Sequence, residues 1–162
     1  MLTTNRKGAI AETAIAHEAV KLGIDVYRPV AEGGRFDLVF AFTDASLARI
    51  QCKWATLARG AIVIRAYSCR RAAEGMRVKR YTADEIDAIA AYCAANGKCY
   101  YVPAERVAGH RLIHLRVQPA RNGQIDGVNS GPAFEPGAIA QLGERSAGSR
   151  KVGGSSPPSS TS

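Results

Sequence analysis

The sequence has no long apolar run, and its apolar stretches are short and interrupted by charged residues. A membrane-spanning helix needs about 20 consecutive apolar residues, so the sequence excludes a membrane span. No secretory signal precedes the first charged segment, and we therefore expect a cytoplasmic protein. Hydrophobic residues still make up 46% of the chain, which excludes a chain that is disordered throughout.

Cysteine is scarce, and its spacing is not that of a typical metal site. No C-x-x-C pair occurs among the four cysteines, which are Cys52, Cys69, Cys93 and Cys99. Because we expect an intracellular protein, we interpret them as reduced thiols rather than as zinc ligands or a disulfide framework.

Acidic residues are nearly absent between Arg49 and Arg80. This stretch has nine basic residues against Glu74, so its excess of eight positive charges equals the net charge of +8 of the whole chain. A concentrated basic surface favours a polyphosphate partner such as nucleic acid, through release of counterions. The alternative is a solvated face of an ordinary basic protein.

The hydrophobic periodicity predicts a helix followed by strands. Ala11, Ile15, Ala19 and Leu22 recur at helical spacing, and Gly23 is a natural stop, which predicts a helix over residues 5–23. Alternating apolar residues predict strands over residues 24–30, 36–42, 47–54, 61–67, 98–102 and 111–117.

A second helix is expected between these strands. Thr82 and Glu85 have the spacing of a capping box, and Ile86, Ile89 and Cys93 follow as a stripe that ends at residues 96–97. The order of helix, strands, helix and strands predicts an α/β (α+β) fold with a mixed central sheet.

The periodicity fails from Pro119 onward. We therefore predict a folded domain over residues 1–118, an irregular extension over 119–136 and a disordered tail over 137–162. The tail is rich in glycine and serine and shows no apolar stripe, so we expect it to add no buried surface.

Three segments place polar residues among apolar neighbours. Glu12 lies three residues before Ile15 and so shares the apolar face of the first predicted helix. Asp37 lies within an apolar strand, just after a glycine turn, while Gln51 and Lys53 share one face of the next predicted strand. An acidic residue followed by such a Q-x-K pair indicates a divalent-metal site beside an ammonium group.

Each residue of this set has a predicted role. Asp37 is the anionic metal ligand, and the Gln51 side-chain oxygen and the Cys52 carbonyl are neutral ligands. Lys53 orients or deprotonates the attacking water and offsets phosphate charge, while Glu12 holds the metal through water. Taken alone, a residue such as Asp37 is more often a strand-edge or turn residue, and one such as Lys53 more often a snorkelling surface residue.

Four separated blocks resemble the PD-(D/E)XK nucleases, over roughly residues 4–118. G-R-F-D-L-V-F followed by I-Q-C-K-W-A resembles the signature itself, and K-G-A-I-A-E-T-A-I resembles the opening helix of the group I intron-associated branch, whose acid falls on Glu12. Y-T-A-D-E-I-D-A-I-A-A-Y-C and K-C-Y-Y-V-P look like the second helix and a late strand of that branch. Phe36 replaces the signature proline, and Gln51 replaces the second acidic residue, as in that branch.

This resemblance implies an α-β-β-β-α-β core and Mg²⁺-dependent cleavage of double-stranded DNA by a homing-type enzyme. The branch also resembles Holliday-junction resolvases. Gln51 removes one negative charge, which weakens metal binding unless Glu12 compensates. Cutting two strands with one site per chain implies a homo-oligomer, a dimer or a tetramer, associated with the nucleoid. We expect phosphate contacts from Tyr81 and from the basic residues Arg70, Arg71, Lys79 and Arg80.

The tail resembles the conceptual translation of a tRNA gene. Residues 140–145 can be encoded by GCT CAG TTG GGA GAG CGT, a D-arm, and residues 154–157 by GGT TCG AGT CCN, the T-arm consensus. Gly148 then falls on the anticodon, and GGC there would specify alanine. A nuclease gene that abuts a tRNA gene suits a mobile element whose target is a tRNA locus. The alternative is a coincidental low-complexity tail.

Three functions remain open from the sequence. The first is a Mg²⁺-dependent homing-type DNA endonuclease. The second is a junction resolvase, which would prefer four-way junctions over linear duplex. The third is a non-catalytic DNA-binding relic, which would keep the basic stretch and cleave nothing.

Overall fold

The first helix lies where the sequence predicts it. The computed structural model describes residues 1–31, 33–118 and 139 of the chain. Helix α1 spans Thr4–Lys21 and is capped by the Thr3 hydroxyl, which accepts a hydrogen bond from the Arg6 N–H. It ends before Gly23, whose φ of 76° is a left-handed conformation that glycine adopts without strain.

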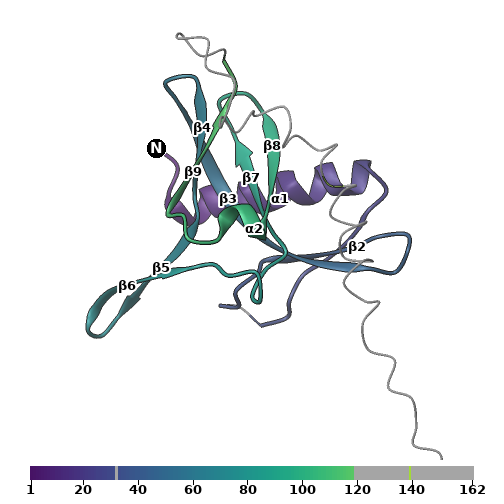
Figure 1. Cartoon of the computed structure of the whole chain (residues 1–162), viewed down its shortest axis with the longest axis horizontal. Helices are drawn as coiled ribbons and strands as arrows, with labels where there is room; N and C mark the ends of the chain where they lie inside the picture. The colour runs from purple at the N-terminus through teal and green to yellow at the C-terminus, as the bar shows by residue number, and fades with distance from the viewer. Residues whose placement is uncertain (32, 119–138, 140–162) are drawn as a thin grey trace, which may run out of the picture.

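Helix α1 lies across one face of a seven-stranded mixed sheet (Figure 1). The remaining elements are β1 (Asp25–Tyr27), β2 (Leu38–Ala41), β3 (Leu47–Ala58), β4 (Ala61–Arg65), β5 (Tyr67–Ala72), β6 (Gly75–Arg80), β7 (Ala88–Cys93), β8 (Lys98–Pro103), α2 (Ala104–Val107) and β9 (Leu112–Arg116). The long strand β3 pairs with β2, β4 and β7, and its pairing with β7 is parallel while the others are antiparallel. The predicted α+β class with a mixed sheet is confirmed.

The helix predicted after Thr82 is wrong. The Thr82 carbonyl accepts hydrogen bonds from the Glu85 and Ile86 N–H groups, so the chain starts a turn there. Residues 88–93 then form β7 in the middle of the sheet. Ala88 and Ala90 pack into the core cluster under α1, whereas the residues that alternate with them pack into a second cluster on the other face. A strand buried on both faces is apolar throughout, and its periodicity does not distinguish it from a buried helix.

The second core cluster is closed by the end of the sheet that carries β4 and β9. Ile62, Ile64, Ile113 and Leu115 of these strands are buried against β7, β8 and α2. Because the sheet bends over its own second face in this way, the outer face of β4 and β9 remains on the surface. The described helices include none that is long and apolar enough to cross a membrane.

Strands β5 and β6 form a two-stranded sheet of their own, which we call the ribbon (residues 67–80). The ribbon extends away from the body of the protein (Figure 1). All six residues of β6 are exposed. The sequence analysis found the basic residues of this segment but predicted neither strand β6 nor the hairpin, although Met76 and Val78 alternate with Arg77 and Lys79.

Ile139 is fully buried in the core cluster under α1. The prediction that residues 137–162 add no buried apolar surface is therefore wrong at this residue. Residues 119–138 and 140–162, which carry the predicted extension and most of the tail, lie outside the described residues. The domain boundaries at 118 and 136 stay predictions.

Removing the Ile139 side chain should destabilise the protein. We expect Ile139→Ala to lower the free energy of unfolding by about 2–4 kcal/mol, because a buried aliphatic side chain is lost and a cavity remains. Val20→Ala is the control, since the Val20 side chain is 60% exposed on α1. Urea denaturation of both variants makes the comparison, and equal stabilities would show that Ile139 contributes nothing to the core.

Candidate active site

Asp37 lies at the start of β2 and points to the middle of β3. Its N–H donates to the Ile50 carbonyl at 2.9 Å, which continues the pairing between the two strands. Its carboxylate accepts hydrogen bonds from the Cys52 N–H, at 2.8 Å, and from the Gln51 side-chain amide. Burial raises the pKa of Asp37, while the bond from Cys52 and the charge of Lys53 oppose this shift. A partly buried carboxylate that is costly to ionise favours a bound cation.

Gln51 brings two oxygens together at one point. Its amide nitrogen donates to the Asp37 carboxylate and to the Cys52 carbonyl, the latter at 3.2 Å. The Asp37 and Cys52 oxygens therefore both face the N–H groups of the Gln51 amide. A position that two oxygens face in this way is also favourable for a bound cation. The Gln51 amide turns its nitrogen, not its oxygen, toward these two oxygens. Its oxygen would join the carboxylate and the carbonyl as a ligand for a hard divalent ion only with the amide group rotated.

These residues fit a divalent metal only as a mixed donor set. Among the described residues, no three His, Cys, Asp or Glu side chains gather into a metal site. The Cys52 thiol is also unsuited to binding a metal, because burial raises its pKa well above the ordinary value and the charges of Asp37 and Glu12 raise it further. Cys52 would therefore contribute its carbonyl, as the sequence predicts.

Glu12 reaches the same place from α1. Glu12 and Asp37 line one cleft of about 410 Å³, whose wall is the loop before β2. The Glu12 carboxylate forms an ion pair with Arg28, with 3.2 Å between nitrogen and oxygen. The fold thus places Glu12 of α1 and Asp37, which are 25 positions apart in the sequence, in the same cleft. Arg28 was missed in the sequence analysis, and no local pattern distinguishes it.

Lys53 is held against a buried tyrosine. Its Nζ donates to the Tyr81 hydroxyl at 2.8 Å and lies 4.9 Å from the centre of the Tyr81 ring. Burial lowers the pKa of Lys53 to about 8, although the charge of Asp37 opposes the shift. An amine with such a pKa can both carry a positive charge and accept a proton near neutral pH.

Tyr81 does not have its predicted place at the surface. The expected phosphate contact is wrong, because Tyr81 is only 3% exposed and its hydroxyl faces Lys53. The guanidinium of Arg35 covers the ring at 4.3 Å from its centre. Tyr81 therefore lies between β3 and Arg35, with its hydroxyl against the Lys53 amine.

Arg35 joins this cluster to the ribbon. It donates to the Ser68 hydroxyl at 2.8 Å, to the Arg80 carbonyl at 2.7 Å and to the Glu85 carboxylate at 2.8 Å. Bonds from Arg35 and Lys79 lower the pKa of Glu85 to about 2, so this carboxylate stays ionised. The sequence analysis gave Arg35 no role in the site. Its spacing of two residues from Asp37 was the signal that could have identified it.

The four predicted DNA-binding residues all belong to the ribbon. Lys79 and Arg80 lie at its root, where Lys79 pairs with Glu85 at 2.5 Å and Arg80 donates to the Gly109 carbonyl at 3.0 Å. Arg70 and Arg71 occupy backbone positions further out along β5. Their role in DNA binding stays a prediction.

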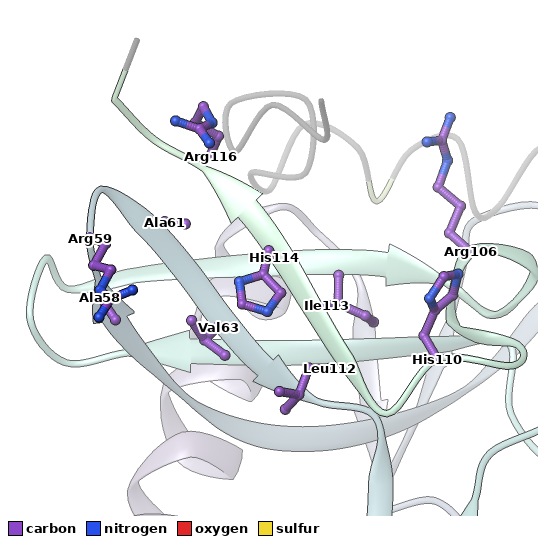
Figure 2. A pocket seen from close by; sticks show the side chains of 10 residues that line it. All are labelled: Ala58, Arg59, Ala61, Val63, Arg106, His110, Leu112, Ile113, His114 and Arg116. Atoms are coloured by element: carbon purple, nitrogen blue, oxygen red, sulfur yellow. The ribbon is translucent and has the colours of Figure 1, made fainter. Parts of the chain in front are cut away.

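A larger hollow of about 540 Å³ lies away from these residues, on the outer side of β4 and β9 (Figure 2). We call it the basic hollow. The described residues that line it include no carboxylate, and its basic and titratable side chains are Arg59, Arg106, His110, His114 and Arg116. It contains none of the predicted catalytic residues, and the smaller cleft with Glu12 and Asp37 is therefore the better candidate for chemistry.

The family follows from a sequence comparison. Residues 2–136 match the family model described as PD-(D/E)XK endonuclease. The chain belongs to the PD-(D/E)XK endonuclease family. It is therefore a nuclease, and the family typically uses a divalent metal.

A solved structure supports the fold. The chain is similar to a bacterial homing endonuclease, I-Ssp6803I, with a TM-score of 0.73 and 22% sequence identity over 93% of this chain and 100% of that one. At this identity the likeness shows a common fold. A search of curated proteins found no match. The PD-(D/E)XK resemblance seen in the sequence is confirmed at the level of the family and the fold, and the roles of the individual residues stay predictions.

Proposed function

We propose that this PD-(D/E)XK endonuclease is a Mg²⁺-dependent, homing-type enzyme that hydrolyses phosphodiester bonds of double-stranded DNA at tRNA loci. The observation that carries the proposal is the convergence of the Asp37 carboxylate and the Cys52 carbonyl on one point of β3, beside the Lys53 amine. The basic ribbon next to this cluster supports a nucleic acid as the substrate.

Asp37, the Gln51 side-chain oxygen and the Cys52 carbonyl would hold the Mg²⁺, and Glu12 would hold it through water. When bound, Mg²⁺ supplies electrostatic stabilisation of the charge that develops on the phosphate. Gln51 makes this site less negative than a pair of carboxylates, so Glu12 contributes charge that β3 does not.

Lys53 acts on the water that attacks phosphorus. As an ammonium it donates to the phosphate oxygens, and as a neutral amine it accepts the proton of the water. The Tyr81 hydroxyl accepts a hydrogen bond from this amine at 2.8 Å and so limits where the amine can lie. The Arg35 guanidinium also packs over the Tyr81 ring, 4.3 Å from its centre.

Cutting both strands of a duplex needs two such clusters, and the described residues form one per chain. We therefore propose a homo-oligomer, a dimer or a tetramer, on the DNA. The tRNA-like reading of residues 137–162 supports a tRNA locus as the target. Light scattering of the purified chain, with and without target duplex, measures the oligomer.

The deciding experiment is cleavage of cloned tRNA-locus DNA with Mg²⁺, with EDTA as the control. We expect a double-strand cut at one position that EDTA abolishes. Faster cutting of a four-way junction than of the linear duplex would instead indicate a resolvase. Binding without cleavage in Mg²⁺ or Mn²⁺ would indicate a DNA-binding relic.

The ribbon should determine how steeply DNA affinity falls with salt. Each phosphate contact contributes about 0.9 to the slope of log K against log salt concentration, so replacing both Arg70 and Arg71 by alanine should reduce the slope by about two. The matched control is Arg59→Ala with Arg116→Ala, which removes the same charge from the basic hollow. Fluorescence anisotropy over a salt series gives both slopes. An unchanged slope in the Arg70 and Arg71 variant would place these residues away from the phosphates.

A further inference from the structure

The ribbon is a narrow, exposed hairpin, and its shape is suited to insertion into a groove. Its two strands pair only with each other among the described strands, and every side chain of β6 is exposed. It leaves the body of the protein next to Tyr81, which follows the last residue of β6 and accepts a hydrogen bond from Lys53. We propose that the ribbon lies in the major groove of the bound DNA and that Arg77 reads a base there. This inference rests on the proposed DNA substrate.

The dimensions of the ribbon suit that groove. The major groove of B-DNA is about 12 Å wide and about 8.5 Å deep, and it admits a two-stranded ribbon. At a rise of about 3.4 Å per residue, strands of this length reach about 20 Å from the root of the ribbon. That reach corresponds to about six base pairs at about 3.4 Å per base pair along the helix axis.

The charges of the ribbon indicate an anionic surrounding. The strand register places Arg70 directly opposite Arg77, and Ser68 opposite Lys79. Arg77 and Lys79 are two residues apart on β6, and two exposed positive charges on one side of a hairpin favour nearby phosphates. These positions lie on one side of the ribbon, while Met76 and Val78 of β6 alternate with them and belong to the other side.

Arg77 is available for a new contact. Its guanidinium pairs with Glu74 at 2.7 Å, but both side chains are more than 70% exposed. Such an exposed pair contributes little to stability, so exchanging it for a base has a small cost. Arginine is suited to this exchange, since its two parallel N–H groups match the N7 and O6 atoms of guanine.

The root of the ribbon is fixed, and base readout requires this. Arg35 donates to Ser68 of β5 and to the Arg80 carbonyl of β6, so one guanidinium joins both strands. The same guanidinium lies over Tyr81, whose hydroxyl accepts from Lys53. The position of the ribbon is thereby coupled to the catalytic amine, and the base pairs that it reads should lie within about six of the cut, by the reach derived above.

The test compares charge with geometry at one position. Arg77→Lys keeps the positive charge but loses the two-pronged contact, Arg77→Ala loses both, and Arg116→Lys in the basic hollow is the matched control. The full-length chains select duplexes from a library that is randomised around the cleavage site, with Ca²⁺ in place of Mg²⁺ so that binding is measured without cutting. The bound DNA is then sequenced.

We expect Arg77→Lys to lose about tenfold or more of the preference for guanine at one or two positions, within about six base pairs of the cut. Its affinity for random duplex and the preferences at other positions should stay within about threefold of the original chain, since the charge remains. Arg116→Lys should change no preference.

Two outcomes would overturn the ribbon assignment: base preferences in Arg77→Lys and Arg77→Ala that equal those of the original chain, or no base preference in the original chain itself. The nuclease proposal is tested separately in Mg²⁺. If the original chain cuts no DNA and the selection still shows the loss in Arg77→Lys, the nuclease proposal fails and the ribbon assignment stands.

Discussion

Replacing Lys53 by alanine should abolish DNA cleavage while DNA binding persists. Lys53 is the amine next to Asp37, and its loss would remove the proposed proton acceptor for the water and a positive charge for the phosphate. General acid–base groups contribute about 10²–10⁴-fold to rates, so we expect a loss of at least about 10³-fold. Single-turnover cleavage in Mg²⁺ measures the rate, and anisotropy measures binding. Cleavage within about threefold of the original rate would remove Lys53 from the chemistry.

Tyr81→Phe provides the matched control for Lys53. It keeps the ring that packs under Arg35 and removes the hydroxyl that accepts from Lys53. Because the amine remains but is less well positioned, the cleavage rate should fall by about fivefold rather than disappear, in line with a lost hydrogen bond of about 1 kcal/mol. An equal loss in both variants would mean that the effect at Lys53 is structural, which a comparison of thermal midpoints would reveal.

The Asp37→Asn variant should lose Mg²⁺-dependent cleavage together with Mg²⁺ binding. Its side-chain oxygen can still accept the Cys52 N–H, so the local fold is retained. Because a single carboxylate anchors the proposed donor set, we expect a loss of at least about 10³-fold in cleavage, comparable with the loss at Lys53. Glu12→Gln should cost less, since Glu12 is proposed to act through water. Calorimetric titration with Mg²⁺ compares the three chains.

The stability of the Asp37→Asn variant gives an independent check. Burial raises the pKa of Asp37, so at neutral pH its negative charge destabilises the folded protein when no metal is bound. Asparagine removes that cost, and the thermal midpoint in EDTA should stay equal or rise. Added Mg²⁺ should then stabilise the original chain and not the variant. A Mg²⁺-induced shift of equal size in both would show that Asp37 is not a ligand.

The local sequence was enough to predict elements that bury a single face, and also the part of the site that lies on two neighbouring strands. Helix α1 follows from its stripe of Ala11, Ile15 and Ala19, together with the stop at Gly23. The approach of Asp37 to Gln51 and Cys52 follows from two antiparallel strands joined by a short turn, whose register is set by their alternating apolar residues. The fold class and the family could therefore be predicted from the chain alone.

The tertiary structure decided what depends on contacts between distant residues. Segment 88–93 becomes a strand because it is buried on both faces of the sheet, a property that its own sequence does not reveal. Arg35 lies over the Tyr81 ring, and the Tyr81 hydroxyl accepts a hydrogen bond from Lys53, so three separate segments meet at this point. That the ribbon extends away from the body of the protein is seen only in the folded structure (Figure 1). Periodicity reports how one segment meets solvent or core, whereas positioning at the site depends on which segments meet each other, and only the folded chain contains that information.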